Sequence, residues 1–530
     1  MTTLTGTGGL IRLILRRDRV RIPVWFGLVA MLVIGIASSV AGAYPTEEAR
    51  LAVLHTTNGD PTQLMMIGPI YDSSAAGLAV WRVRGQAALL IALASLFLVI
   101  RSTRAEEEAG RSELLGSTVV GRHAALTAAL TVAFAANLVT ALVVALGLMG
   151  QGLPARGSLV MGLSVAAAGW VFAALAGLTA QLTDSSRTAA GIAATAMGVL
   201  YAVRATADVE KSSWVAWLSP FGWTQHMRPF AGDHLWPLLP VIGLISLLVA
   251  GAYRISARRD LGAGILPPRL GPADAAPGLR TSLALAWRLQ RGTLLAWTVA
   301  FTAFGAGLGG VARSAAEQLN ASEALRGLIE RMGGGGRPAD GFFAFVIYLM
   351  SQVITVYAIQ ATLRLRAEET SGRAEIILTG PVGRLRWAGG HLAIVAAGSG
   401  IVLAGLGLGM GLVHGLSTGD LGGEISQLLG ASLTRLPSVL VLAAISALVY
   451  GLLPRLAAII AYTALALCLV LEFAVELLHA DPSILKVSPF AQTPGLPVAE
   501  LTVTPLILLA VIATGLTAVG LAALHRRDLG

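Results

Sequence analysis

The residues of this chain that are best suited to specific chemistry lie in one charged segment that occurs twice. Residues 104–122 read RAEEEAGRSELLGSTVVGR and residues 366–384 read RAEETSGRAEIILTGPVGR. Arg-Ala-Glu-Glu, Gly-Arg-x-Glu and a closing Val-Gly-Arg recur at identical spacing, 262 residues apart. Glutamates and arginines on a short helix interrupted by glycine offer ion pairs and hydrogen bonds to another protein. We call the two copies the first and second docking segments, because their repetition predicts a polar surface presented once by each half of the chain.

The remaining residue types form no catalytic or metal-binding pattern. Among eight histidines there is no His-Glu-x-x-His, and the single cysteine, Cys468, excludes a disulfide framework and a thiolate metal site. The chain also lacks a Gly-x-x-x-x-Gly-Lys-Ser/Thr loop, which would cradle nucleotide phosphates, and Lys211 and Lys486 are its only lysines. We therefore predict no catalytic residue, no metal and no cofactor bound by this chain. If ATP drives its function, ATP and Mg²⁺ must bind to a separate partner.

Composition predicts the elements that position the docking segments. The 530 residues are 55% hydrophobic and 13% charged, with mean hydropathy +0.74, whereas ordinary globular proteins carry about 25% charged residues. Apolar stretches long enough to cross a bilayer as helices recur along the chain. We expect an all-α polytopic protein of the inner (plasma) membrane. Its formal net charge of +9 fits arginines at cytoplasmic helix ends, so we expect no nucleic-acid partner.

Further repeats predict that the chain consists of two halves. Ser219-Pro220-Phe221 recurs as Ser488-Pro489-Phe490, and Arg-Arg-Asp-Leu-Gly occurs at 258–262 and again at 526–530. We predict a first half at 1–262, a cytoplasmic Pro/Gly/Ala linker at 263–280 and a second half at 281–530. Six spans in each half make the repeats parallel, with both termini cytoplasmic. The twelve expected transmembrane helices lie near 24–43, 83–102, 123–149, 157–181, 188–206, 235–255, 293–312, 342–363, 387–413, 426–450, 456–478 and 502–524.

Each half is expected to begin with an amphipathic elbow helix that lies in the headgroup layer. The stretch from Leu10 to Arg21 alternates Ile and Leu with Arg, as interfacial helices do. Leu285 to Arg291 repeats the pattern before the seventh span. Because the element recurs in the middle of the chain, we interpret the first copy as an elbow rather than a cleavable leader.

The docking segments follow the second span of each half and are predicted to lie across its cytoplasmic mouth. Each combines charged ends with an apolar middle, which suits a cleft in a soluble partner, and two copies suit a two-fold symmetric partner. The alternative is a solvated loop with snorkelling arginines, but retention of the pattern in both halves favours docking. The residues expected at the partner interface are Arg104, Glu106, Glu107, Gly110, Arg111, Glu113, Arg366, Glu368, Glu369, Gly372, Arg373 and Glu375.

The order of these elements resembles a known family. Each half is similar to the type-2 (ABC-2) permeases of ATP-binding-cassette exporters. The shared order is an elbow helix, a span, an outer loop, a span, the R-A-E-E-x-x-G-R-x-E segment and four more spans ending in a basic tail. Doubled in one chain, and with the WLSPFGW stretch Trp217–Trp223, the pattern looks most like the tetronasin-type polyketide-antibiotic exporters. The resemblance implies that the docking segments are coupling helices that contact a separate ABC ATPase, which is expected in two copies. It also implies export of hydrophobic or amphiphilic compounds, such as drugs or lipids.

A hydrophobic substrate is expected to pass between the two halves, where polar and ionisable residues in or near the spans are candidates for its path. These candidates are Arg82, Arg84, Arg204, Gln352, Tyr357, Gln360 and Glu472. Ala344 and Val346 occupy the positions in the second half that match Arg82 and Arg84. This asymmetry suggests a preference for anionic amphiphiles. The alternative for each residue is an interfacial side chain that reaches headgroups or water.

Two other functions are compatible with a polytopic chain. A twelve-span secondary transporter of the major facilitator type, driven by an ion gradient, also has parallel six-helix repeats. That family's loop after the second span is shorter and carries an Asp-Arg pair that is missing here, and it has no elbow before each half. A membrane enzyme would need a cluster of acids or histidines at a membrane face, and the sequence has none. The predicted function is therefore that of a non-enzymatic permease subunit.

Overall fold

The computed structural model describes residues 3–44, 46–59, 61–110, 119–210, 213–260, 262–266, 274, 277–320, 338–477, 485 and 487–527. Within these residues the regular structure is helical throughout, which confirms the all-α prediction. The chain divides into two compact units, Met1–Gly271 and Pro272–Gly530. Their boundary falls inside the stretch 263–280 that was predicted as a linker.

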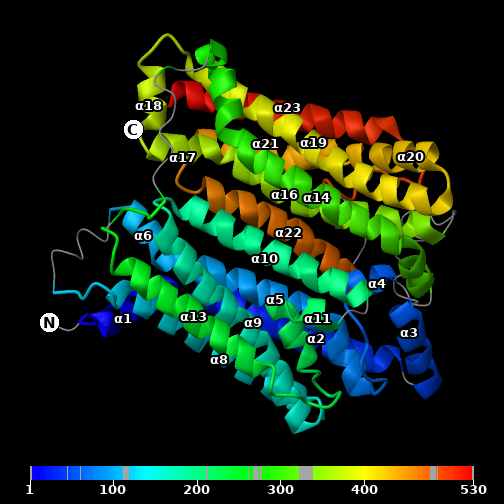
Figure 1. Cartoon of the computed structure of the whole chain (residues 1–530). Coiled ribbons are helices and arrows are strands. Elements are labelled where there is room, and N and C mark those ends of the chain that lie inside the picture. Colours follow the sequence, from blue (N-terminus) through cyan, green and yellow to red (C-terminus); the bar gives the residue numbers. More distant parts are fainter. Residues whose placement is uncertain are drawn as a thin grey trace. The chain divides into compact units, whose positions relative to one another are not determined.

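Unit 1 is built from long apolar helices that are connected by short ones (Figure 1). Helices α5 and α9 are its most buried spans, because small residues line much of their surfaces and let neighbouring helices approach. The short helices α1 and α6 lie at one end of this unit, and α3 and α4 lie at the other (Figure 1). Its helices are α1 (Thr7–Arg17), α2 (Arg21–Ala43), α3 (Glu47–Gly59), α4 (Pro61–Met66), α5 (Ala75–Ser102), α6 (Arg104–Glu108), α8 (Ala124–Gly150), α9 (Ala155–Leu182), α10 (Ser186–Val209), α11 (Ser213–Ala216), α12 (Pro220–His226) and α13 (Leu238–Ser256).

Unit 2 repeats the same order of long helices, with the second docking segment again following the second one. The short helices α17 and α18 carry this segment at one end of the unit (Figure 1). Its helices are the 3-10 turn η1 (Pro277–Arg280), α14 (Ser282–Asn320), α16 (Pro338–Thr362), α17 (Arg364–Thr370), α18 (Arg373–Leu378), α19 (Arg384–Thr418), α20 (Leu421–Leu433), α21 (Leu436–Leu452), α22 (Ala457–Leu477) and α23 (Val503–Arg526).

Eleven helices of the described residues are long and apolar enough to cross a membrane, which confirms a polytopic membrane protein. The predicted span at 456–478 coincides with α22, whose fully described part, Ala457–Leu471, is shorter than the others. The predicted span at 426–450 is divided into α20 and α21. Pro437 near the start of α21 explains the division, because proline cannot donate the backbone hydrogen bond that would continue α20.

The two elbows differ, and the prediction of a separate second elbow is wrong. In unit 1 the amphipathic helix α1 ends at Arg17, and α2 begins after a short turn. In unit 2 the residues Leu285–Arg291 are the first turns of one continuous helix, α14. Pro23 lies in the first turn of α2, where its fixed φ is favourable and its missing N–H is harmless. The matching residue of α14 is Leu295, which allows the helix to continue unbroken.

Glycines bring the two longest helices of unit 2 into close contact. A Cβ at Gly309 of α14 would lie 2.5 Å from the Met410 carbonyl oxygen of α19. A Cβ at Gly409 of α19 would lie 2.2 Å from the Thr302 carbonyl oxygen of α14. The backbones can therefore pack this closely only where side chains are absent.

The Gly409→Ala variant is expected to destabilise the protein by about 1–3 kcal/mol, because the added methyl group overpacks this interface. Thermal unfolding of the purified protein in detergent measures the loss. Gly389→Ala on the same helix is the control, since a Cβ there meets nothing within 4 Å. Equal melting temperatures for the two variants would contradict close packing at Gly409.

Candidate partner-docking site

The first docking segment begins with an arginine that is fully buried in unit 1. Helix α5 ends at Ser102, and Arg104 starts the short helix α6. The Arg104 guanidinium donates hydrogen bonds to the carbonyl oxygens of Ala180 (3.0 Å), Gly262 (3.2 Å) and Ala263 (2.9 Å). This side chain has no exposed surface. Arg104 therefore fixes α6 to the end of α9 and to the residues after α13.

Glu107 joins the same segment to the tail that follows α13. Both of its carboxylate oxygens accept hydrogen bonds from Arg259, at 2.6 and 2.8 Å, and one also accepts from Arg104 at 2.7 Å. Arg259 donates in addition to Gln181 Oε1 at 2.7 Å. The side chains of Glu107 and Arg259 are 12% and 7% exposed, so the pair is largely shielded from water. A bidentate pair in such surroundings holds its two elements in one relative orientation.

Two further acidic residues of the first docking segment also have partners inside unit 1. Glu106 accepts a hydrogen bond from Arg17 at the end of the elbow helix α1. Glu108 accepts hydrogen bonds from the backbone N–H of Ser186 (3.0 Å) and from the Ser186 hydroxyl, at the start of α10. The elbow and the helix α10 are thus both attached to α6 through carboxylates.

The second docking segment also pairs a glutamate with the arginine of the tail, here through one guanidinium nitrogen that bonds both carboxylate oxygens. Glu369 on α17 accepts hydrogen bonds from Arg527, which follows α23, at 2.8 and 2.9 Å. The Tyr450 hydroxyl at the end of α21 donates a third hydrogen bond to Glu369 at 2.6 Å. The Arg527 guanidinium also lies 5.1 Å from the centre of the Tyr450 ring. Glu369 therefore connects the docking segment to the ends of two spans of unit 2.

Glu368, in contrast, is paired within its own segment. This buried carboxylate accepts hydrogen bonds from Arg364 and Arg373, each at 2.8 Å. The hydrogen bond to Glu368 raises the pKa of the Arg373 guanidinium, so Arg373 stays charged at any physiological pH. Arg373 begins α18, and the ion pair consequently fixes α18 to α17 across the turn between them.

In both units the tail after the last long helix closes onto the docking segment, and the sequence analysis missed this contact. Glu107 and Glu369 are matching residues of the repeat, and so are their partners Arg259 and Arg527. The closing arginine of each docking segment reinforces the contact: Arg122 donates to the Arg259 carbonyl at 2.7 Å, and Arg384 donates to the Arg527 carbonyl at 2.6 Å. We call each set a tail clamp. The repeated Arg-Arg-Asp-Leu-Gly was the signal that could have revealed it.

After the clamped residues are set aside, the exposed part of the second docking segment lies on α18. Ile376 is 76% exposed, and Glu375 beside it is also exposed. Gly372 precedes this helix with φ +72°, a left-handed conformation that glycine adopts without strain. Arg366 is half-buried on α17. Charged and aliphatic groups presented together on a short helix can bind a cleft in a soluble partner.

In the first docking segment, Gly110 also has a left-handed φ, +70°, at the equivalent turn. Arg111 and Glu113, which were predicted at the interface, lie outside the described residues. Of the described residues that border this stretch, Gly110 is partly exposed and Val119 is exposed. The two segments therefore share the turn that ends their clamped part.

Two of the predicted substrate-path residues meet in a buried cluster near α4 and α12 of unit 1. Arg204 forms an ion pair with Asp208 (3.3 Å) and donates to the Met65 carbonyl (2.7 Å). Arg84 lies within electrostatic reach of both side chains. Arg84 and Arg204 are 6% and 2% exposed. Gln225 donates a hydrogen bond to Asp208 at 2.7 Å.

This cluster carries more positive than negative charge. Arg84 and Arg228 both stack against the Tyr71 ring, at 5.3 and 4.4 Å from its centre. Among the described residues of the cluster, Asp208 is thus the only carboxylate for three arginines. Gly68 lets the loop backbone approach, since a Cβ there would lie 3.3 Å from both Arg204 and Asp208. An uncompensated positive charge in a buried site attracts anions.

Of the other predicted path residues, Arg82 belongs to unit 1 and the rest belong to unit 2. Arg82 is partly exposed and donates a long hydrogen bond (3.5 Å) to the Tyr44 hydroxyl. Gln352 and Tyr357 are buried in unit 2, where the Tyr357 ring packs 5.9 Å from that of Trp297. Gln360 is exposed on α16. Glu472 belongs to α22, but its side chain lies outside the described residues.

Comparisons with known proteins agree with a transport role. The family model "Multidrug efflux system permease Rv1217c, C-terminal domain" matches residues 279–525. The multidrug efflux system permease protein Rv1217c of Mycobacterium tuberculosis is 38% identical over 526 residues, which are 99% of this chain and 95% of that protein. Both names describe a drug-efflux permease and not the polyketide-antibiotic exporters that the sequence pattern resembles. With eleven apolar helices and a relative of this similarity, the chain belongs to the multidrug efflux permease family of Rv1217c.

Proposed function

We propose that this chain is the membrane-spanning subunit of an ATP-driven exporter, and that its docking segments transmit movement from a separate ABC ATPase. The observation that carries the proposal is the pair of tail clamps. Each clamp joins a short helix to the tail after the last long helix of its own unit through an ion pair in which both carboxylate oxygens of a glutamate accept hydrogen bonds from one arginine. A partner that moves a docking segment would thereby move membrane-spanning helices. ATP and Mg²⁺ would bind to the ATPase. Two docking segments would accommodate two copies of it.

The family assignment supports this proposal over the major facilitator alternative. The relative is named as the permease of an efflux system, which suits a chain that works with other components. The ABC-2 resemblance adds the expectation of a cytoplasmic ATPase, with both termini on the cytoplasmic side of the inner membrane. The arginines of α1, with Arg16 and Arg17 in its last turn, suit that side.

The cargo is proposed to be hydrophobic or amphiphilic. The buried arginines Arg84 and Arg204, with the half-buried Arg228 beside them, favour compounds with an anionic group. Polyketide antibiotics with a carboxylate are one class that fits, which would make the chain similar in substrate to the tetronasin-type exporters. Comparing export of a carboxylate drug with that of its methyl ester by an Arg82→Ala/Arg84→Ala variant separates this preference from a general loss of transport.

Co-purification tests the proposed partner. The tagged full-length chain, extracted from its native membrane, is expected to retain an ATPase that mass spectrometry identifies by its Gly-x-x-x-x-Gly-Lys-Ser/Thr motif. An Ile376→Asp variant is expected to retain at least about tenfold less of it, because it places a charge in the apolar centre of the docking surface. ATP-dependent dye efflux from vesicles should fall in parallel.

Leu453→Asp is the matched control. Like Ile376, Leu453 is an exposed aliphatic side chain (52%), and it lies on a loop predicted to face the cytoplasm. Charge reversal at Glu106, Glu107, Glu368 or Glu369 is less informative, since these carboxylates already pair with arginines inside their own units. Equal ATPase retention by the two variants would contradict docking through α18. Proton-driven transport by the chain alone, without ATP, would contradict the proposal as a whole.

A further inference from the structure

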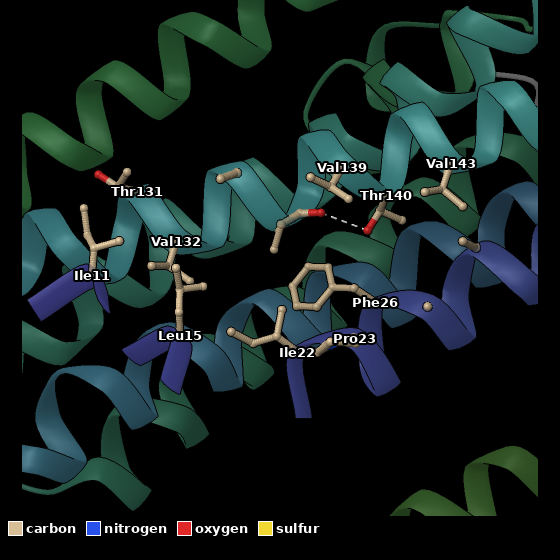
Figure 2. Close-up of a pocket in the computed structure, with 14 residues that line it drawn as sticks. Ile11, Leu15, Ile22, Pro23, Phe26, Thr131, Val132, Val139, Thr140 and Val143 are labelled. Carbon is tan, nitrogen blue, oxygen red and sulfur yellow. Dashed lines mark hydrogen bonds between the residues drawn. The ribbon is translucent and has the colours of Figure 1, made fainter. Parts of the chain in front are cut away.

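An apolar cavity of about 440 Å³ lies between the elbow helix and two membrane spans of unit 1. This volume is within the range of about 300–1,000 Å³ found for small-molecule sites. The cavity is lined by Ile11 and Leu15 of α1, by one face of α2 from Ile22 to Ala30, and by one face of α8 from Thr131 to Val143. Figure 2 shows these side chains in a row, with Ile11 and Leu15 near one end, the Phe26 ring in the middle and Val143 at the other end.

The cavity has the length and the polarity of one lipid leaflet. The α8 residues from Thr131 to Val143 span roughly 18 Å of helix, which is slightly more than half of the ~30 Å hydrocarbon core. The Thr140 hydroxyl donates to the Ala136 carbonyl at 2.9 Å (Figure 2), so this group is satisfied within the helix and the lining stays apolar. Leu15, Val139 and Val143 are 48%, 59% and 46% exposed, which shows that the cavity is an open groove.

Positive charge stands beside one end of this groove. Arg12 and Arg16 are exposed and directly follow the lining residues Ile11 and Leu15 on α1. Consecutive residues of a helix are about 100° apart, and Ile14 of the same helix faces the core. Arg12 and Arg16 therefore lie on the side of the groove that is farther from the core. Among the described residues no carboxylate pairs with either of them, whereas Arg17 on the opposite side binds Glu106.

At the matching place in unit 2, Gly405 of α19 corresponds to Val143 and packs against α14, where a Cβ would lie 2.6 Å from the Thr302 hydroxyl oxygen. In unit 1, Pro23 separates the elbow from α2, and Gly27 leaves space beside it. A Cβ at Gly27 would meet nothing within 4 Å.

We propose that the groove binds an anionic glycerophospholipid, with one acyl chain between α2 and α8 and its phosphate against Arg12 and Arg16. A single acyl chain matches the groove in length and apolarity, and the two arginines supply the charge that selects an anionic headgroup over a zwitterionic one. The bound lipid would fill the gap beside the elbow and hold α1 against α2 and α8. This site is independent of the proposed ATPase partner.

Photo-crosslinking tests this inference. The full-length protein is placed in nanodiscs that contain a trace of phosphatidylglycerol or phosphatidylcholine with a diazirine in the middle of one acyl chain, and labelled peptides are mapped by mass spectrometry. Phosphatidylglycerol is expected to label residues 131–143 and 22–30 at least about tenfold more strongly than phosphatidylcholine. The Arg12→Gln/Arg16→Gln variant should reduce its labelling to the level of phosphatidylcholine.

The controls separate binding in the groove from ordinary contact with lipid. Arg288→Gln/Arg291→Gln removes two exposed arginines from the matching part of unit 2 and should leave labelling unchanged. Gly27→Phe should fill the groove and abolish labelling by both lipids, whereas Gly35→Phe on the same helix, where a Cβ also meets nothing within 4 Å, should not. Thermal unfolding of each variant verifies that it is folded.

Three results would overturn the proposal. Equal labelling by both lipids would show that the arginines select no headgroup. Labelling that persists in a folded Gly27→Phe variant would place the probe outside the groove. Competition by an exported dye, but not by unlabelled phosphatidylglycerol, would assign the groove to cargo instead.

Discussion

Efflux by the Arg259→Glu variant is expected to fall at least about tenfold, because the substitution breaks the tail clamp of unit 1. Glu107 would lose both hydrogen bonds from Arg259 and would face a second carboxylate in a largely buried position. Removing one partner of a buried ion pair costs about 3–5 kcal/mol, which is enough to detach the docking segment from the end of α13. ATP-dependent dye efflux from vesicles, compared at equal amounts of folded protein, measures the loss.

The neighbouring arginine provides the control for this prediction. Arg258→Glu makes the same change of charge one residue away, at an exposed side chain with no described partner, and should retain most of the activity. The exchanged pair Glu107→Arg/Arg259→Glu should recover part of the loss. Arg527→Glu, with Arg526→Glu as its control, repeats the experiment in unit 2. Similar activities for Arg258→Glu and Arg259→Glu would show that the clamp does not transmit movement.

Asp208→Asn is expected to destabilise the protein more than any other single substitution in the arginine cluster of unit 1. Asp208 is the described carboxylate that compensates Arg84 and Arg204, both of which are more than nine-tenths buried. Without it these cations would remain buried and uncompensated, at a cost of about 3–5 kcal/mol. Thermal unfolding in detergent measures the effect, and the melting temperature should fall clearly below that of the parent protein.

A second substitution separates charge from packing in this cluster. Arg204→Gln in the Asp208→Asn background removes one of the uncompensated cations, so the double variant should be more stable than Asp208→Asn alone. Addition of an anionic cargo should also raise the melting temperature of the parent protein if it binds these arginines. A double variant that is as unstable as the sum of its two single variants would show that net charge does not determine stability there.

Composition and apolar stretch length were sufficient to predict the fold class, because every backbone polar group inside a bilayer must be paired within a helix. The positions at which helices break were harder to predict. The second elbow followed the same Arg/Leu pattern as the first, yet it continues into α14. The pattern shows that a segment is amphipathic but not whether it ends. That depends on single residues, such as Pro23 in one half and Leu295 in the other.

The candidate site was predicted in part. Repetition identified the docking segments correctly as distinct elements after the second long helix, but it could not distinguish residues that face inward from those that face outward. Arg104 and Glu107 were expected at the partner interface, and the structure places both against the tail of their own unit. Such contacts join residues more than 150 positions apart. Local spacing carries no information about them, although the repeated Arg-Arg-Asp-Leu-Gly carried some.

The tail clamp also has a consequence for biogenesis. Arg259 and Arg527 both come after the final long helix of their units, so neither docking segment can be locked in place until that helix has been inserted. A half-inserted unit would display Glu107 or Glu369 without its arginine, on a segment that is not yet held in its final orientation. Attachment of the proposed ATPase would then select fully inserted permeases, and incomplete ones would remain uncoupled and available to quality-control proteases.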